Sequence, residues 1–339
     1  MSMPIRLRSF ALALPLILRS AFGAPQSTLD PAGPAAKYIS NLSWIVYMTF
    51  CVVGVIMWIL LAWASTRRKG SFDHHEPVDI EDGHSWIFIG GLVIPFVILA
   101  TIFVLGLNTM AAFPVHDGGH VHPEIRVTGR QWWWDVEYVS GPIEAHFRTA
   151  NEIHIPVGRP VDIELLSTDV IHSFWVPRLH GKEDLVPGQP NVIRIEADQP
   201  GSYPGQCAEY CGAQHAHMML SVVAQSPSDY ETWAAGQRNP FAQPVNDQQM
   251  RGQQLFRAKP CALCHTIRGT DAQGTVGPDL THIGSRQGIA ANMLANNPAN
   301  LAAWVTHAQA LKPASQMPNV SQFTGDELQA LVAYLQSLK

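Results

Sequence analysis

Charged residues are scarce in this sequence. Asp, Glu, Lys and Arg make up 14% of the 339 residues, against roughly a quarter in typical soluble proteins. The chain also lacks a cluster of Lys and Arg able to follow a phosphate backbone, which argues against nucleic acid as a partner. Hydrophobic residues reach 47%. We therefore expect part of the chain to lie in membrane lipid and the rest to form two modest globular domains.

The N-terminal third has the pattern of an exported membrane hairpin. Residues 1–24 combine early arginines, an apolar run and small residues, as secretory signal peptides do; an uncleaved anchor is the alternative. Residues 42–64 and 86–113 are each long enough to cross the bilayer as a helix. The basic segment Arg67 to Lys69 between them predicts a cytoplasmic loop. The hairpin and the segment before it thus span residues 25–113, and all that follows is predicted to lie outside.

The exported part divides into two domains and a linker. Residues 114–225 contain short β-type runs separated by Pro and Gly, which predicts an all-β sandwich or barrel. Residues 226–245 are rich in Ser, Pro, Gln and Asn and are interpreted as a linker, with some helix signal around Asp229 to Gly236. Residues 246–339 return to apolar residues at helical spacing, so the last domain is predicted to be small and helical. The β-region is acidic and the helical region slightly basic, which would help the two to associate.

One stretch of the predicted β-domain gathers side chains that suit copper in an electron-transfer site. It offers two thiolates, two imidazoles and a thioether. The candidate side chains are His172, Cys207, Cys211, His215 and Met218. A disulfide between the two cysteines is the alternative in an oxidising compartment. A disulfide would not require histidines and a methionine at these spacings, so copper is favoured.

The helical domain carries the pattern of covalent haem attachment. In Cys261-Ala-Leu-Cys264-His265 two thiols would form thioethers with the haem and the adjacent histidine would bind the iron. A thioredoxin-like pair is the alternative, but it needs a βαβ setting and no following histidine. The sixth iron ligand should be a methionine, because Met/His ligation raises the reduction potential. Met317 is favoured for this role over Met293, because its place between the haem motif and the last helix is similar to that of the ligand in class I cytochromes c.

The copper segment resembles the CuA loop of subunit II of haem-copper oxidases, and the last domain resembles a class I cytochrome c. The resemblance implies a two-helix transmembrane hairpin, an all-β cupredoxin-like domain and an all-α cytochrome c domain. It also implies a dinuclear CuA centre whose coppers share both thiolates. One copper would also take His172 and Met218, and the other His215 and the backbone carbonyl of Glu209.

The same resemblance assigns roles around the copper loop. Trp132 would receive electrons from the cytochrome, while packing or a place at the membrane interface is the alternative for Trp133 and Trp134. The Glu209 carboxylate would bind Mg²⁺ or Mn²⁺ shared with subunit I. The family's proton-channel glutamate is replaced here by Gly83, so we assign no proton-uptake residue.

The resemblance, together with these features, implies a subunit of a proton-translocating cytochrome c oxidase in the bacterial inner membrane, with its copper and haem domains on the periplasmic or extracellular face. Its haem c would accept electrons from cytochrome c or a cytochrome bc complex, and CuA would pass them to subunit I, which reduces oxygen in another chain. Subunit III is a further expected partner. The alternatives are a CuA-containing nitric oxide reductase subunit and a non-catalytic copper-binding assembly protein. A nitrous oxide reductase would need a larger catalytic domain, and a quinol oxidase subunit would lack the copper ligands.

Overall fold

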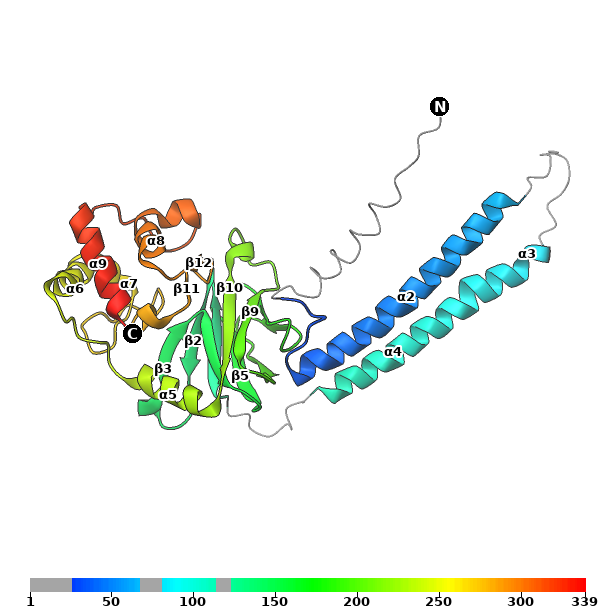
Figure 1. Cartoon of the computed structure of the whole chain (residues 1–339), viewed down its shortest axis with the longest axis horizontal. Helices are drawn as coiled ribbons and strands as arrows, with labels where there is room; N and C mark the ends of the chain where they lie inside the picture. The colour runs from blue at the N-terminus through cyan, green and yellow to red at the C-terminus, as the bar shows by residue number, and fades with distance from the viewer. Residues whose placement is uncertain (1–25, 68–80, 114–122) are drawn as a thin grey trace, which may run out of the picture. The chain divides into compact units, whose positions relative to one another are not determined.

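The computed structural model describes residues 26–67, 81–113 and 123–339, which form two compact units (Figure 1). The first unit runs from Lys37 to Asp117 and holds the two long helices. The second contains the β-domain and the helical domain together with the short segment before Lys37. The predicted signal peptide lies outside the described residues.

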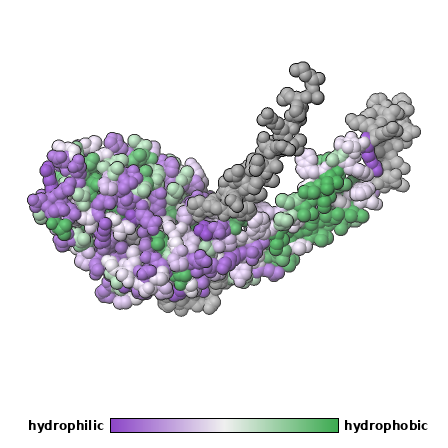
Figure 2. Space-filling model, in the orientation of Figure 1, coloured by the Kyte–Doolittle hydropathy of each residue, from purple (hydrophilic) through white to green (hydrophobic). Residues whose placement is uncertain are grey.

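The helical unit consists of two long apolar helices. Pro34–Thr66 spans 33 residues with a mean hydropathy of 2.5. Gly83–Ala112 spans 30 residues with a mean hydropathy of 2.8 and runs through three consecutive helical elements. Their large apolar side chains are exposed, as at Trp58 and Phe103, and much of this surface is apolar in Figure 2. Exposed apolar surface of this extent is stable in lipid rather than in water. The elements are α2 (Pro34–Thr66), α3 (Glu81–Ser85), the π-helical η1 (Trp86–Val93) and α4 (Ile94–Ala112).

The β-domain is a sandwich of two five-stranded sheets, in the orders β3-β2-β1-β5-β8 and β4-β10-β9-β6-β7. Apolar residues alternate along the strands and meet in one core between the sheets, which includes Trp134 and Phe174. The predicted cupredoxin-like all-β domain is confirmed. Its strands are β1 (Ile125–Arg130), β2 (Trp133–Tyr138), β3 (Phe147–Ala150), β4 (Glu152–Pro156), β5 (Val161–Ser167), β6 (His172–Trp175), β7 (Glu183–Leu185), β8 (Asn191–Ile195), β9 (Gly201–Cys207) and β10 (Met219–Gln225).

The segment predicted as a linker is instead packed against the β-domain. Helix α5 (Pro227–Arg238) begins at Ser226, whose side chain accepts a hydrogen bond from the backbone N–H of Asp229. The Trp233 ring stacks on His154 with ring centroids 3.9 Å apart. The face of helix α5 toward the sandwich is therefore apolar and aromatic. This part of the segment is not a flexible tether. Composition misled here because a few large side chains outweigh many polar ones.

The last domain is helical, as predicted, and is built around the crossing of its first and last helices. Gly252 permits that crossing, because a Cβ there would lie 2.1 Å from the carbonyl oxygen of Ala330. A capping box of Thr324 and Glu327 begins the last helix. The elements are α6 (Asp247–Ala258), α7 (Cys261–Cys264), η4 (Ile283–Ser285), β11 (Gly288–Ile289), β12 (Leu294–Ala295), α8 (Pro298–Leu311) and α9 (Gly325–Ser337).

Candidate metal centres

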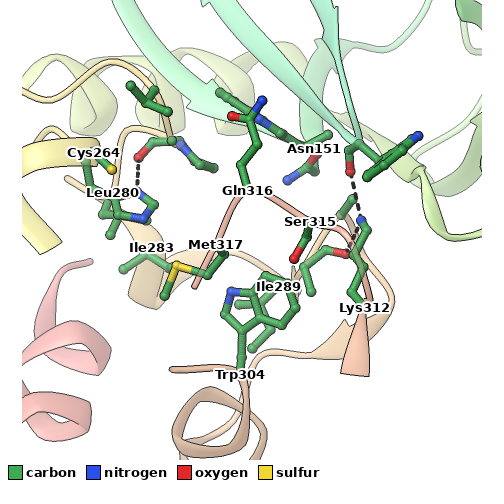
Figure 3. A pocket seen from close by; sticks show the side chains of 18 of the residues that line it. Asn151, Cys264, Leu280, Ile283, Ile289, Trp304, Lys312, Ser315, Gln316 and Met317 are labelled. Atoms are coloured by element: carbon green, nitrogen blue, oxygen red, sulfur yellow. Dashed lines mark hydrogen bonds between the residues drawn. The ribbon is translucent and has the colours of Figure 1, made fainter. Parts of the chain in front are cut away.

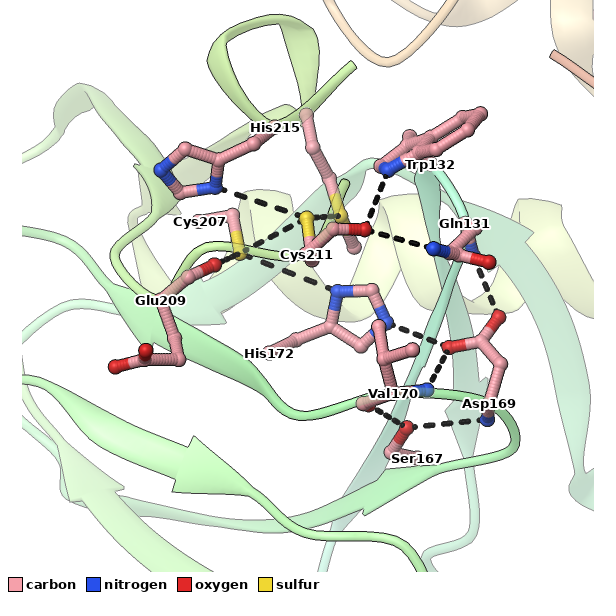
Figure 4. Close-up of polar contacts among 11 residues, drawn as sticks. Gln131, Trp132, Ser167, Asp169, Val170, His172, Cys207, Glu209, Cys211 and His215 are labelled. Atoms are coloured by element: carbon pink, nitrogen blue, oxygen red, sulfur yellow. Dashed lines mark hydrogen bonds and ion pairs between the residues drawn. The ribbon is translucent and has the colours of Figure 1, made fainter. Parts of the chain in front are cut away.

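Strand pairing brings the predicted copper ligands together at one end of the sandwich. Strand β6 pairs with β9 so that Phe174 lies opposite Cys207, which places His172 beside the cysteine loop. The Sγ atoms of Cys207 and Cys211 are 3.8 Å apart. His172 Nδ1 is 4.0 Å from Cys207 Sγ, and His215 Nδ1 is 3.6 Å from Cys211 Sγ (Figure 4). Four predicted ligand side chains thus converge.

The remaining donors complete a buried, protein-supplied cluster. The Met218 sulfur lies 3.9 Å from Cys211 Sγ, and the Glu209 carbonyl oxygen lies 3.2 Å from Cys207 Sγ. Both cysteines are free thiols, so the alternative of a disulfide is not realised. Thiolate, imidazole and thioether donors around one small space fit copper. Because the protein supplies the donors from a buried position, the cluster suits electron relay better than substrate chemistry.

The two thiols do not ionise alike. The hydrogen bond from the Cys211 thiol lowers the pKa of Cys207 to about 3, and the same interaction raises the pKa of Cys211. Because metals bind thiolates, a proton on either sulfur has to leave when a metal binds.

Three neighbouring residues hold His172 in place, and sequence reasoning gave none of them a role. His172 Nε2 donates to Asp169 Oδ1 at 2.8 Å, which leaves Nδ1 directed at the sulfurs. Asp169 Oδ2 also accepts a hydrogen bond from the backbone N–H of Gln131. Gly129 lies under the ring, where a Cβ would be 2.7 Å from His172 Cδ2. The spacing of Asp169, three residues before His172, was the one available signal.

The three consecutive tryptophans lie in different surroundings. Trp132 is 8% exposed, and its Nε1 donates to the carbonyl oxygen of Cys211 at 2.8 Å. Trp133 lines the cavity of the helical domain described below. Trp134 is buried in the sandwich core, edge-on to Phe174, so the packing alternative describes it well.

The predicted haem residues line two adjoining cavities: Cys264, His265 and Met317 line both, and Cys261 lines the one within the cytochrome-like domain. The other, which we name the haem cavity, is drawn in Figure 3. His265 Nδ1 donates to the carbonyl oxygen of Pro278 at 2.8 Å, so the other ring nitrogen is free to bind iron. Burial lowers the pKa of His265, which favours the neutral ring that a metal needs. The residues present therefore fit a covalently bound haem.

Close packing fixes the two predicted axial ligands. A Cβ at Gly277 would meet His265 Cε1 at 2.5 Å. Gln309 Nε2 donates to the carbonyl oxygen of Met317 at 2.7 Å and so anchors its loop. Met317 lines the cavity, whereas Met293 is not among the lining residues in the described part of the chain.

The haem cavity is shared between the two exported domains. Gln131, Trp132 and Trp133 from the β-domain line it together with His265 and Met317. Trp132 therefore borders the haem cavity on one side and donates a hydrogen bond to Cys211, a candidate copper ligand, on the other. Trp132 thus connects the two candidate centres.

The Glu209 side chain points away from the copper cluster (Figure 4). Its carboxylate is substantially exposed and lies 3.9 Å from the Lys182 ammonium. One residue thus offers its backbone oxygen to the buried cluster and its carboxylate to the surface.

Comparison with known proteins agrees with this architecture. Residues 124–225 match the family described as "Cytochrome C oxidase subunit II, periplasmic domain", and residues 249–339 match cytochrome c. Cytochrome c oxidase subunit 2 of Alkalihalophilus pseudofirmus is 36% identical over 96% of this chain and 95% of its own length. The Bacillus subtilis protein of the same name is 28% identical over 97% and 96%. Quinol oxidase subunit 2 of Bacillus cereus is 29% identical over 61% of this chain and 71% of its own length.

The fold and the two centres define a membrane-associated subunit of the haem-copper oxidase type with a cytochrome c domain fused to its C-terminus. The chain belongs to the cytochrome c oxidase subunit 2 family. It is therefore a component of an oxidoreductase complex whose partner is a haem-copper subunit I.

Proposed function

We propose that this chain is the subunit through which electrons reach a respiratory terminal oxidase. Its haem domain takes electrons from cytochrome c or a cytochrome bc complex, and its copper domain passes them to subunit I, where oxygen is reduced to water and protons are pumped. The observation that carries the proposal is the position of Trp132, which borders the haem cavity and hydrogen-bonds to the Cys211 carbonyl.

The copper centre is proposed to be the dinuclear CuA type. Both thiolates would bridge the metals, with His172 and Met218 on one copper and His215 and the Glu209 carbonyl on the other. The buried cluster and the Asp169 hydrogen bond support this assignment, because they hold the donors still as the charge changes. A fixed donor set lowers the reorganisation that accompanies electron transfer.

The haem is proposed to be attached through Cys261 and Cys264, with His265 and Met317 as axial ligands. A bound haem c would supply one-electron redox chemistry at a potential raised by the Met/His pair. The role of this chain is to orient the ligands and to keep water from the cavity, which Leu280, among others, lines.

A hard divalent cation, Mg²⁺ or Mn²⁺, is proposed at the surface facing subunit I, with Glu209 as a ligand. The exposed carboxylate supports this assignment. Nearby, Asp184 Oδ1 is buried and has no hydrogen-bond partner in the described structure. Asp184 lies opposite Ser173 in the pairing of β6 and β7. The Ser173 carbonyl accepts a hydrogen bond from the backbone N–H of Ala208, the residue before Glu209. Asp184 and Glu209 therefore lie on adjoining segments.

We further propose that the hairpin lies in the bacterial inner membrane, that the copper and haem domains lie on its periplasmic or extracellular face, and that subunit III joins the complex. The two apolar helices support the membrane placement. The orientation rests on the basic residues after α2, of which Arg67 is described.

Metal analysis of the purified chain and turnover of the purified complex test the proposal. Elemental analysis should find two coppers and one iron per chain, as a dinuclear centre and a single haem require. The complex should consume oxygen with reduced cytochrome c as donor. Turnover of nitric oxide without oxygen consumption would instead favour the nitric oxide reductase alternative, and readily exchanged copper without haem would favour an assembly protein.

A further inference from the structure

The helical domain contacts the β-domain through a short hairpin next to the haem cavity. We name residues Gly288–Ala295, which comprise β11, β12 and the turn between them, the docking loop. The backbone N–H of Met219, at the start of β10, donates to the carbonyl oxygen of Ala291 at 3.2 Å. Asn292 Nδ2 donates to the Asn151 carbonyl oxygen and to Ser221 Oγ, both at 3.1 Å. The loop is therefore hydrogen-bonded to strand β10 and to the residue before β4.

The backbone of the docking loop is strained. Ala290, Ala291 and Asn292 have φ angles of 55°, 60° and 57°, and the two alanines are poorly suited to this region. Such strain persists where surrounding contacts hold it. Here the surrounding contacts come from the other domain, which indicates a surface shaped for docking rather than a chance encounter.

Lys312 makes the second link between the domains. Lys312 is the residue directly after helix α8, and it is 2% exposed. Its ammonium donates to the carbonyl oxygens of Trp132 at 2.8 Å, His217 at 2.9 Å and Ala290 at 3.2 Å. Figure 3 shows Lys312 at the edge of the haem cavity. An ammonium has three donors, and each of them finds an acceptor. Burying a cation is costly unless its donors are satisfied, so this position is built for these three carbonyls.

Lys312 contacts both the docking loop and Trp132. Two of its acceptors belong to the β-domain, and one of them is the carbonyl of Trp132 itself. The third acceptor, Ala290, belongs to the docking loop. Lys312, Ala290 and Trp132 also line the cavity that His265 borders. Release of Lys312 would therefore loosen both the loop and the alignment of the tryptophan with the haem cavity.

We propose that Lys312 and the docking loop form an interdomain lock that holds the haem cavity against Trp132. Lys312 is a positioning residue: it binds no metal and acts through Trp132. The inference rests on the proposed function and adds a consequence to it. Because the chain's own haem domain covers Trp132, an external cytochrome reduces the haem rather than the copper centre directly.

The test compares Lys312→Met with wild type in the assembled complex. Lys259→Met is the matched control, because the Lys259 ammonium donates to a carbonyl of its own domain, that of Gln322. The first readout is the rate of haem-to-CuA transfer after photoreduction of the haem, at increasing solvent viscosity. The second is hydrogen exchange of the backbone amides of Met219 and Gln287, both of which donate across the domain boundary.

In Lys312→Met the transfer rate should fall about tenfold or more and become viscosity-dependent, since a hydrogen bond to a charged group contributes at least that factor to an equilibrium. Exchange at both amides should accelerate by a similar factor. The optical spectra of haem and CuA should remain those of wild type. Lys259→Met should match wild type in every readout.

A wild-type rate with wild-type exchange in Lys312→Met would overturn the lock. Loss of copper or haem from that variant would also overturn it, because Lys312 would then support a metal site rather than align two domains. Asn292→Ala, which removes only the amide donors of the loop, should accelerate exchange in the same direction by a few fold. Absence of any haem-to-copper transfer in wild type would refute the proposed function, and the exchange measurements would still decide the lock.

Discussion

Replacing Gly129 by alanine should disable the copper centre without touching a copper ligand. A Cβ at this position would lie 2.7 Å from Cδ2 and 2.9 Å from Cγ of His172. Because carbon atoms in ordinary contact are about 3.5–4.0 Å apart, the ring would have to retreat by roughly 1 Å. His172 is fully buried and is tied to Asp169, so it has little room to do so.

The substitution is expected to lower both the stability of the domain and its affinity for copper. Overpacking of this kind destabilises a domain by about 1–3 kcal/mol. Misplacing a metal ligand through its surroundings lowers metal affinity by about 10–100-fold. Copper per chain, the CuA absorption and EPR signals and the unfolding midpoint should therefore all fall in Gly129→Ala.

Gly236→Ala is the matched control. A Cβ at Gly236 meets no atom within 4 Å, and the residue lies in helix α5 outside the copper cluster. This variant should keep its copper and gain up to about 1 kcal/mol of stability, because alanine restricts the unfolded chain. Full copper occupancy with an unchanged spectrum in Gly129→Ala would refute the reasoning about His172.

Three further substitutions, one of them paired with a control, probe the copper site, the haem site and helix α5. Asp169→Asn should weaken copper binding by about 10–100-fold, measured by competition with a copper chelator, because His172 loses its charged acceptor; unchanged affinity would show that the carboxylate is dispensable. Met317→Leu should abolish the sulfur-to-iron charge-transfer band of the oxidised haem, and Met293→Leu should leave it; the opposite pattern would exchange their roles. Trp233→Ala should lower the free energy of unfolding by about 3 kcal/mol through loss of packing between α5 and the sandwich, measured by denaturant titration, and a change under 1 kcal/mol would mean that α5 is held by other contacts.

The candidate ligands could be selected from the sequence because copper and haem chemistry constrains residue type and spacing at once. Cys207, Cys211 and His215 lie within nine residues, and Cys261 to His265 form one contiguous pattern. The structure brings both groups together as expected. Local spacing is enough for them because one short loop supplies most of the donors.

The supporting residues could not be predicted in the same way. Gly129 matters only because β1 places it under the His172 ring, and no local pattern marks it. Lys312 lies 180 residues from Trp132, its acceptor, so only the folded arrangement reveals the contact. Such roles depend on tertiary contact rather than on sequence neighbours.

A helix signal around Asp229 to Gly236 indicated helix α5, but the whole segment was still interpreted as a linker. Tyr230, Trp233, Ala234 and Gln237 recur at helical spacing, and all four lie on its packed or buried side. Polar composition favoured a linker, but the free energy of packing depends on the apolar residues of one face. The pattern of a segment was more informative than its average.

The proposed electron path requires the haem to accept electrons before the copper centre does. Stopped-flow reduction of the intact complex by reduced cytochrome c, followed at haem and CuA wavelengths, separates the two events. The account predicts that the haem is reduced first and that copper follows at the rate at which the haem is reoxidised. Reduction of copper before the haem, or at a rate unaffected by Met317→Leu, would contradict it.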